Sequence, residues 1–146
     1  MKYVIHTDGG ARGNPGSAAV GVVIEKILVT EKGSQTNLVT EFGKKIGKTT
    51  NNTAEYTAVI EALKYFITQG EQSRPTKNDT LNFYLDSTLV VNQLNGLYKV
   101  KRSHLRSLLM TTRLLEAEVG AKIRYTAVPR EQNRRADVFV NAALDS

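Results

Sequence analysis

Four acidic residues occupy positions from which their carboxylates could act together in catalysis. Asp8 and Asp86 each follow a short apolar run, and Glu55 and Asp137 fall near the starts of two amphipathic stretches. Clustered carboxylates repel one another unless cations lie between them. Hard oxygen ligands, in a chain without cysteine, favour Mg²⁺ or Mn²⁺ over zinc. Two such ions about 4 Å apart can clamp a phosphodiester for in-line hydrolysis, so the four acids indicate metal-assisted hydrolysis if the fold assembles them.

Three of these acids also have simple structural explanations. Asp8 precedes Gly9, and Asp-Gly is a common hairpin turn, which Asp8 taken alone favours. Asp86 can cap the helix that follows it, and the helix dipole favours Asp137 in a first helical turn. Several such coincidences at one expected sheet edge favour a shared site over independent structural roles.

Glu55 has an explanation of its own, in which it belongs to a helix cap. Asn52 and Glu55 have the spacing of a capping box at a helix start. Glu55 also falls on one helical stripe with Val59, Ala62 and Phe66, which we expect to face the core. A carboxylate directed at the sheet needs a partner there, so the pattern favours a functional role over capping alone.

Strands and helices alternate along the chain in a way that can position these acids. We expect the first strand to end at Asp8 and to run into a glycine loop over residues 9–16. Three strands with short links predict an antiparallel meander, followed by a polar connector over 46–52. A helix between strands implies a parallel crossover, so the strand before Asp86 should lie beside the first. The expected order is β-β-β-α-β-α-α-β-α, with elements at 3–8, 18–30, 35–46, 53–68, 81–85, 89–94, 103–119, 123–128 and 134–144.

Composition bounds the class of protein. The chain has 146 residues, of which 40% are hydrophobic and 23% charged, which predicts one globular domain over residues 1–146. We expect no membrane span and no signal peptide, and the lack of cysteine fits a cytoplasmic location. The net charge of +6 suggests an anionic partner such as nucleic acid, although charge alone is equally consistent with a basic protein that has no such partner.

A basic segment precedes the penultimate helix. Lys99, Lys101 and Arg102 follow Tyr98, and Arg106 comes one helical turn later. Interleaved basic and aromatic residues suit a nucleic-acid contact. The alternative is a solvated loop that leads into a helix.

The chain resembles type 1 ribonuclease H over nearly its whole length. No single motif is specific, but together they are. The matching motifs lie at 7–10 (TDGG), 13–16 (GNPG), 50–55 (TNNTAE), 85–87 (LDS), 90–94 (VVNQL), 128–133 (VPREQN) and 136–137 (AD).

The resemblance implies an α/β ribonuclease H-like fold with a five-stranded mixed sheet, three strands antiparallel and two parallel, flanked by helices. It implies an endonuclease that hydrolyses the RNA strand of RNA–DNA hybrids and leaves 5′-phosphate and 3′-hydroxyl ends. Mg²⁺ is the implied cofactor, with Mn²⁺ as a possible substitute and two ions per site once substrate is bound. We expect the protein to act as a monomer, with no separate hybrid-binding domain before the catalytic one.

The resemblance also assigns roles to residues. Asp8 and Asp86 match ligands that bridge or flank the two metals, and Asp137 matches the ligand of the metal that activates water. Glu55 matches a ligand of one metal and a contact to the ribose 2′-hydroxyl. The implied substrate-binding residues are Gly9, Gly10, Asn14, Thr50, Asn51, Asn52, Lys99, Lys101 and Arg102. Among these, the asparagines match minor-groove positions that sense 2′-hydroxyls, and Thr50 matches a position that holds a DNA-strand phosphate.

Two features depart from well-known members of that family. The loop before the last helix carries no histidine, so its proton-transfer role would fall to Arg130 or Glu131. The inserted basic handle is also missing, and the segment at Lys99 to Arg102 is expected to retain part of its grip. The two histidines lie elsewhere: we expect His6 to pack in the core and His104 to lie on the surface.

Two other functions remain open on the sequence alone. A catalytically weak hybrid-binding module would keep the fold without the chemistry, but the presence of all four acids argues against it. Another nuclease of the same superfold, such as a junction resolvase, would share the acids. The Asn51-Asn52 pair, which suits 2′-hydroxyl sensing, argues against that alternative.

Overall fold

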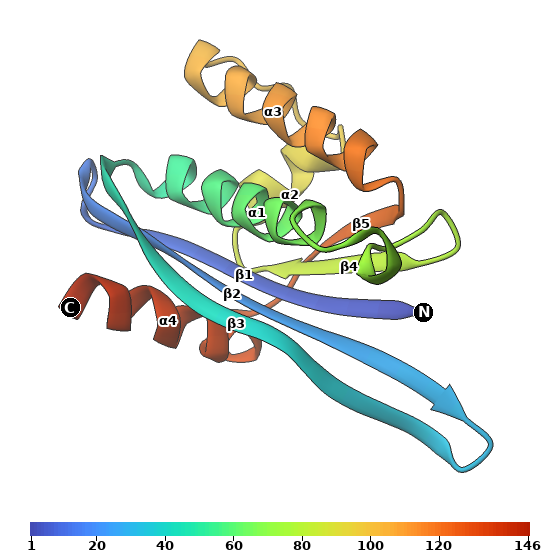
Figure 1. Ribbon diagram of the computed structural model, residues 1–146. Helices are drawn as coiled ribbons and strands as arrows, with labels where there is room; N and C mark the ends of the chain where they lie inside the picture. The colour runs from blue at the N-terminus through green and yellow to red at the C-terminus, as the bar shows by residue number, and fades with distance from the viewer.

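A five-stranded mixed sheet forms the centre of the molecule in the computed structural model (Figure 1). The structure describes residues 1–146, apart from the side chain of Glu71. The spatial order is β3-β2-β1-β4-β5, with β1 antiparallel to β2 and parallel to β4. The predicted α/β fold, with three antiparallel strands followed by two parallel ones, is therefore confirmed. The strands are β1 (Lys2–Gly13), β2 (Gly16–Thr30), β3 (Gly33–Thr49), β4 (Thr80–Leu85) and β5 (Lys122–Ala127).

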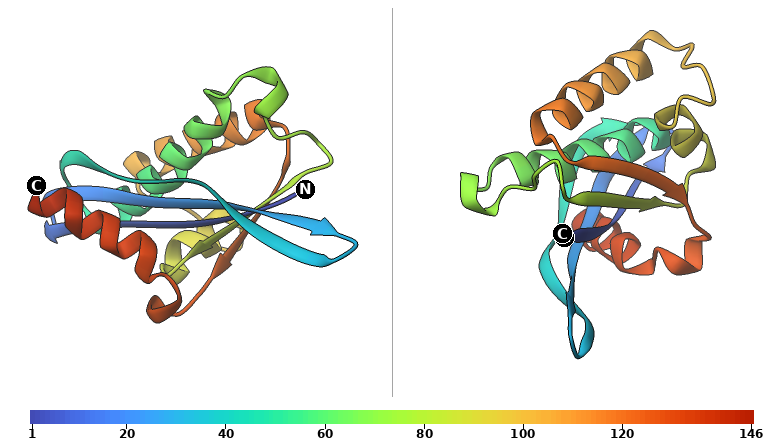
Figure 2. Two further views of the ribbon diagram at one scale, coloured as in Figure 1. Left: turned by 60° about the horizontal axis from the view of Figure 1, so that its bottom comes forward. Right: turned by 90° about the vertical axis from the view of Figure 1, so that its right-hand side faces the viewer.

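Helices cover both faces of this sheet (Figure 2). The helix α1 (Asn51–Ile67) packs on β1 and β2, and α3 (Ser103–Val119) packs on α1. On the opposite face, α4 (Arg134–Asp145) lies across β1, β2 and β3. The short α2 (Thr88–Leu94) follows β4, and two single turns of 3₁₀ helix occur at η1 (Glu71–Ser73) and η2 (Arg130–Gln132).

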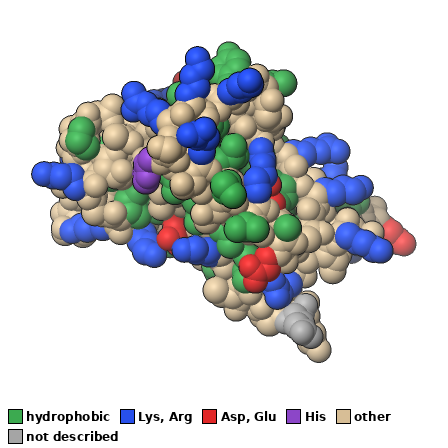
Figure 3. Space-filling view, turned by 90° about the horizontal axis from the view of Figure 1, so that it is seen from above, with side chains coloured by type: hydrophobic (Ala, Val, Ile, Leu, Met, Phe, Trp, Pro, Cys, Tyr) green, Lys and Arg blue, Asp and Glu red, His purple; other side chains and the backbone are tan. Residues whose placement is uncertain are grey.

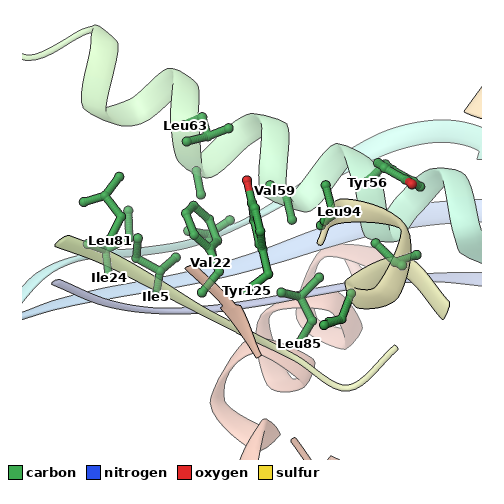
Figure 4. Close-up of a cluster of buried hydrophobic side chains, with 14 of the residues drawn as sticks. Ile5, Val22, Ile24, Tyr56, Val59, Leu63, Leu81, Leu85, Leu94 and Tyr125 are labelled. Atoms are coloured by element: carbon green, nitrogen blue, oxygen red, sulfur yellow. The ribbon is translucent and has the colours of Figure 1, made fainter. Parts of the chain in front are cut away.

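The main hydrophobic core lies between α1 and the sheet (Figure 4). Val59 and Leu63 point from α1 toward Ile5 of β1 and Leu81 of β4, and each of these four side chains is buried. The helical stripe and the alternating strand pattern therefore meet as the sequence predicts. This packing fixes α1, and with it the start of that helix, against the carboxyl end of β1.

The parallel pairing of β1 with β4 brings Asp8, which lies within β1, close to the end of β4. Ile5 pairs with Phe83 and His6 with Tyr84. Asp8 follows His6 by two residues and Asp86 follows Tyr84 by two. The two acids therefore lie at the same edge of the sheet, as the crossover argument predicts.

Two stretches expected to be irregular are strand instead. The prediction of a glycine loop is wrong, because β1 continues through Gly9 and Gly10 to Gly13 and stays paired with β2. The polar connector is also wrong, since β3 continues to Thr49 after a register shift opposite Ala18. Asp8-Gly9 is consequently not a hairpin turn. The ends of β1 and β3 are only partly buried, so polar residues can occupy them.

Close approach of α4 to the sheet depends on two glycines. A Cβ added to Gly21 would overlap the backbone carbonyl of Ala136, and one added to Gly43 would overlap that of Phe139. Small residues at these strand positions let the helix backbone rest directly on β2 and β3. Asp137, in the first turn of α4, is thereby held on the same cavity as Asp8 of β1.

Other features of the helices bear on the sequence predictions. Gly120 ends α3 in the left-handed conformation, as predicted. Ser103 is the first residue of α3 and not its cap, since Arg102 holds the cap position without a side-chain hydrogen bond. Among the described residues, no helix combines the length and apolar character that a bilayer crossing requires.

Candidate active site

Three of the four predicted acids meet at the carboxyl edge of the sheet. Asp8, Glu55 and Asp86 each offer one carboxylate oxygen, and these three oxygens lie within 4.8 Å of one another. Asp8 comes from β1, Glu55 from the first turns of α1, and Asp86 from the residue after β4. Carboxylates this close repel one another, and a divalent cation bound between them would offset that repulsion.

Glu55 reaches the cluster because another residue caps α1. Thr50 is the cap, with its hydroxyl accepting from the Thr53 amide at 3.3 Å, so the predicted capping box at Asn52 is wrong. Glu55 is buried and points at the sheet, where Oε1 accepts from the Gly9 amide at 3.2 Å. Gly9 permits this contact, since a Cβ there would overlap the carbonyl of Ala54.

Asp86 is likewise free of a capping role. Ser87 caps α2, with its hydroxyl accepting from the Val90 amide at 3.2 Å. The Asp86 carboxylate instead faces the cluster, and its Oδ2 lies 4.0 Å from Nε of Arg130. Ser87 and Thr50 thus satisfy the helix ends and leave both acids available for another task.

Asp137 lines the same cavity as Asp8 and Glu55. This acid cavity has a volume of about 360 Å³ and is also bordered by Gly9, Gly10 and Arg130. Asp137 is half-buried, and it stands outside the tight three-oxygen group. Its carboxyl raises the pKa of Asp8 through a hydrogen bond and through charge repulsion.

Burial and mutual repulsion make the acid cluster electrostatically unfavourable without a cation. Burial, followed by the charges of Asp86 and Asp137, raises the pKa of Asp8 to about 7. Burial and the neighbouring Asp8 raise the pKa of Glu55 well above its ordinary value. Burial also raises the pKa of Asp86, although Arg130 and the Asn133 amide oppose that shift.

The donor set fits a hard divalent cation. Glu55 Oε2 and Asp86 Oδ2 are buried and have no hydrogen-bond partner among the described residues. A buried carboxylate oxygen without a partner is costly. A bound cation would satisfy both oxygens and would lower the raised pKa values by favouring the charged forms.

A larger cavity adjoins the acid cavity. Its volume is about 820 Å³. The predicted residues that line it are Asn14, Thr50, Asn51, Asn52, Lys99, Lys101 and Arg102. Asn51 and Asn52 border both cavities and therefore stand between them. Lysine and arginine side chains are spread over the face on which α3 lies, with few acids among them (Figure 3), which suits a polyanion.

Two of the asparagines are held in a defined orientation. The backbone N–H of Asn51 donates to Asn14 Oδ1 at 2.9 Å, and the backbone N–H of Ala11 donates to Asn51 Oδ1 at 2.9 Å. Both side-chain oxygens are thus occupied by backbone donors. The side-chain NH₂ groups remain available to acceptors on a ligand.

The structure separates the two residues proposed to replace the loop histidine. Arg130 borders the acid cavity and approaches Asp86. Glu131 is exposed and does not border the acid cavity or the larger one. Of the histidines, His6 is half-buried and stacks on Tyr84 at 5.3 Å, so it is packed as expected but not fully enclosed. His104 is exposed as predicted, although it borders the larger cavity.

Sequence reasoning assigned no role to two buried amides. Asn133 is 1% exposed, and its Nδ2 donates to the Thr7 carbonyl at 2.9 Å, directly beside Asp8. Gln93 is 6% exposed and bonds to Tyr56. The available signal for Gln93 was its position among the apolar residues of α2. For Asn133, it was its place at the end of the VPREQN motif.

Comparison with known proteins agrees with this geometry. The reverse transcriptase-like family model matches residues 6–143. Ribonuclease HI of Halobacterium salinarum is 41% identical over 139 residues, which cover 94% of this chain and 62% of that protein. The bifunctional protein Rv2228c of Mycobacterium tuberculosis is 35% identical over all 146 residues, and the chain spans 36% of its length, about a third.

Solved structures give the same assignment. LC11-RNase H1, isolated from compost by a metagenomic approach, is 41% identical with a TM-score of 0.83, over 99% of this chain and 96% of that one. The same protein in complex with an RNA/DNA hybrid is 40% identical with a TM-score of 0.82, over 98% and 96% of the two chains. The likeness in sequence and fold extends over nearly the whole chain, which belongs to the type 1 ribonuclease H family.

Proposed function

We propose that this chain hydrolyses the RNA strand of RNA–DNA hybrids and leaves 5′-phosphate and 3′-hydroxyl ends. The observation that carries the proposal is the group of three carboxylates, two with buried unpartnered oxygens, beside a larger cavity bordered by asparagines and basic residues. A hydrolase for a nucleic-acid backbone needs both parts. Membership of the ribonuclease H family and the hybrid complex of LC11-RNase H1 support the same substrate.

In this proposal, divalent cations are held by Asp8, Glu55, Asp86 and Asp137. Mg²⁺ is the expected ion, with Mn²⁺ as a substitute and two ions once substrate is present. When bound, such ions supply Lewis acidity and a nucleophile at neutral pH. The oxygen-only donor set, in a chain without cysteine, supports the choice of a hard cation.

The chain's own residues would bind and orient the hybrid. The free NH₂ groups of Asn14 and Asn51 suit the acceptors of a minor groove and of a ribose 2′-hydroxyl, which distinguishes RNA from DNA. Lys99, Lys101 and Arg102 would meet phosphates in the larger cavity. Arg130, beside Asp86 and exposed to solvent, would contact the phosphate at the acid cavity.

The proposal extends to the organisation of the molecule. We take residues 1–146 as one catalytic domain that acts as a monomer. A cytoplasmic location fits the absence of cysteine.

A substrate panel tests the proposed function. Labelled RNA–DNA hybrid, duplex RNA, duplex DNA and a four-way junction are incubated with the protein, with Mg²⁺ and with EDTA. The expected result is cleavage of the hybrid in Mg²⁺ and none in EDTA. Binding without cleavage would instead identify a hybrid-binding module, and preferred cleavage of the junction would identify a different nuclease. An Asp8→Asn variant purified in parallel controls for contaminating nucleases.

A further inference from the structure

Gln93 is a buried amide on α2 with no role in the site described so far. It is 6% exposed, and its Oε1 accepts a hydrogen bond from the Tyr56 hydroxyl at 2.6 Å. Tyr56 is itself fully buried in the core cluster that also contains Leu94 (Figure 4). The pair therefore joins the buried side of α1 to the buried side of α2.

The geometry of this hydrogen bond fixes the orientation of the amide. A separation of 2.6 Å is typical of an O–H···O bond and shorter than the usual N–H···O distance. Oε1 therefore faces Tyr56, and the Nε2 group must point the other way. Nε2 has no hydrogen-bond partner among the described residues, and unlike Glu55 Oε2 it is not sealed off from solvent. It is thus a donor that a ligand can reach.

The cavity that Gln93 borders is the larger one, which also contains Thr50, Lys99 and Lys101. The acid cavity lies on the other side of Asn51 and Asn52, which border both. If the RNA strand presents its scissile phosphate to the acids, the minor groove faces the asparagines. The opposite strand, which is DNA in a hybrid, then falls in the larger cavity.

We propose that Gln93 Nε2 donates a hydrogen bond to a phosphate oxygen of the DNA strand, and that Tyr56 is the positioning residue that aims it. This inference rests on the proposed function for the assignment of strands. The lysines of the cavity are flexible and supply attraction over a range of positions. A buried amide held by a buried hydroxyl supplies one donor at one place, so it sets the register of the hybrid more than its overall affinity for polyanions.

Hybrid binding in EDTA is the first test, because it does not require catalysis. The dissociation constant of a fluorescein-labelled hybrid is measured by anisotropy for the wild-type protein and for Gln93→Leu. The expected result is binding weakened about tenfold or more, as for a lost hydrogen bond to a charged group. The dependence of the binding constant on salt concentration should stay unchanged, since the substitution removes no lysine or arginine contact to a phosphate. Gln69→Leu is the matched control, because its amide bonds to the Tyr65 carbonyl within α1 and borders neither cavity.

Two further variants separate positioning from simple loss of stability. Gln93→Glu keeps an acceptor for Tyr56 but presents a carboxylate to the phosphate, so it should bind hybrid more weakly than Gln93→Leu. Tyr56→Phe should weaken binding on its own but add no further loss to Gln93→Leu, because its effect passes through the amide. With Mg²⁺, these variants should raise KM and leave kcat near the wild-type value.

Hybrids with a single methylphosphonate, which lacks the phosphate charge and one acceptor oxygen, locate the contact. At one position of the DNA strand, the modification should weaken hybrid binding by the wild-type protein and leave hybrid binding by Gln93→Leu unchanged. Wild-type affinity in both Gln93 variants, or a sensitive position on the RNA strand, would overturn the inference. A wild-type protein that binds but does not cleave would refute the proposed function alone, whereas one that does not bind hybrid would refute both.

Discussion

Asp86 is the residue at which a metal-holding role and a structural role predict opposite results. Ser87 already caps α2, so the Asp86 carboxylate is not needed for the helix. The Asp86→Asn variant should lose nearly all hybrid cleavage, because a neutral amide is a poor cation ligand. It should also raise the metal-free melting temperature in low salt, since one like charge leaves a crowded cluster.

Cleavage rates and melting curves with and without Mg²⁺ check this prediction on one variant. Mg²⁺ should shrink the gain in melting temperature, because it stabilises the wild-type cluster more. Asp79→Asn is a less suitable control, since that acid pairs with the amino terminus at 3.0 Å. Glu118→Gln, on the exposed side of α3, is preferable. Retained cleavage together with unchanged melting would assign Asp86 to structure alone.

The pKa of Asp8 predicts how metal-free stability changes with pH. That pKa is raised from 3.8 to about 7, so the folded state holds a proton that the unfolded chain releases between these values. The contribution of Asp8 to stability is therefore full below pH 4 and is lost as the pH rises to 7. The cost reaches on the order of 1–4 kcal/mol at neutral pH.

Chemical denaturation of wild type and Asp8→Asn across pH 4 to 8 measures this contribution. The variant should be close to the wild type at the acidic end and increasingly more stable toward neutral pH. Saturating Mg²⁺ should remove most of that difference. A difference in stability that stays constant with pH would mean that Asp8 does not titrate in this range.

At the level of elements, the order of strands and helices was predictable because apolar periodicity is strong in this chain. The crossover argument correctly placed β4 beside β1. The ends of β1 and β3 were missed, because their glycine and polar residues have the composition of a loop. The structural reason for the glycines, which is the close approach of α1 and α4, is not visible in the sequence. The caps at Thr50 and Ser87 were missed for a related reason, since neighbouring polar residues compete for the same position.

The candidate site was predictable only in part. Four acids at element ends, together with the resemblance, identified the acid cavity. The Gln93–Tyr56 pair was not predictable, because its partners are 37 residues apart and neither carries a charge. Asn133 bonds to Thr7, which lies 126 residues away. Contacts of this range appear only when the helices are placed on the sheet.

The close packing of α4 on β2 gives a prediction at this scale. The Gly21→Ala variant should lose about 1–3 kcal/mol of stability, because the new methyl group would overlap the Ala136 carbonyl. It should also lower kcat, since Asp137 is the next residue and shifts with the helix. Gly70→Ala is the matched control: its φ is −61° and an added Cβ would meet nothing within 4 Å. Equal stability and kcat for the two variants would contradict this account of the packing.

At the scale of the whole molecule, the net charge of +6 becomes informative once the basic residues are placed. Lys101 and Arg102 border the larger cavity. Changing both to Ala should raise KM and reduce the salt slope of hybrid binding by up to about 2, if each meets one phosphate. Changing Lys122 and Arg124 of β5, which are exposed and border neither cavity, is the control for net charge. Equal slopes in the two double variants would place the hybrid elsewhere.

The most direct test of the central claim follows each strand of one hybrid separately. An RNA–DNA hybrid is labelled on either strand and incubated with the protein in Mg²⁺, and the ends of the products are identified. The account predicts cuts in the RNA strand only, with 5′-phosphate and 3′-hydroxyl ends, an intact DNA strand, and no reaction in EDTA. Cutting of the DNA strand, or RNA cleavage that persists in EDTA, would contradict it.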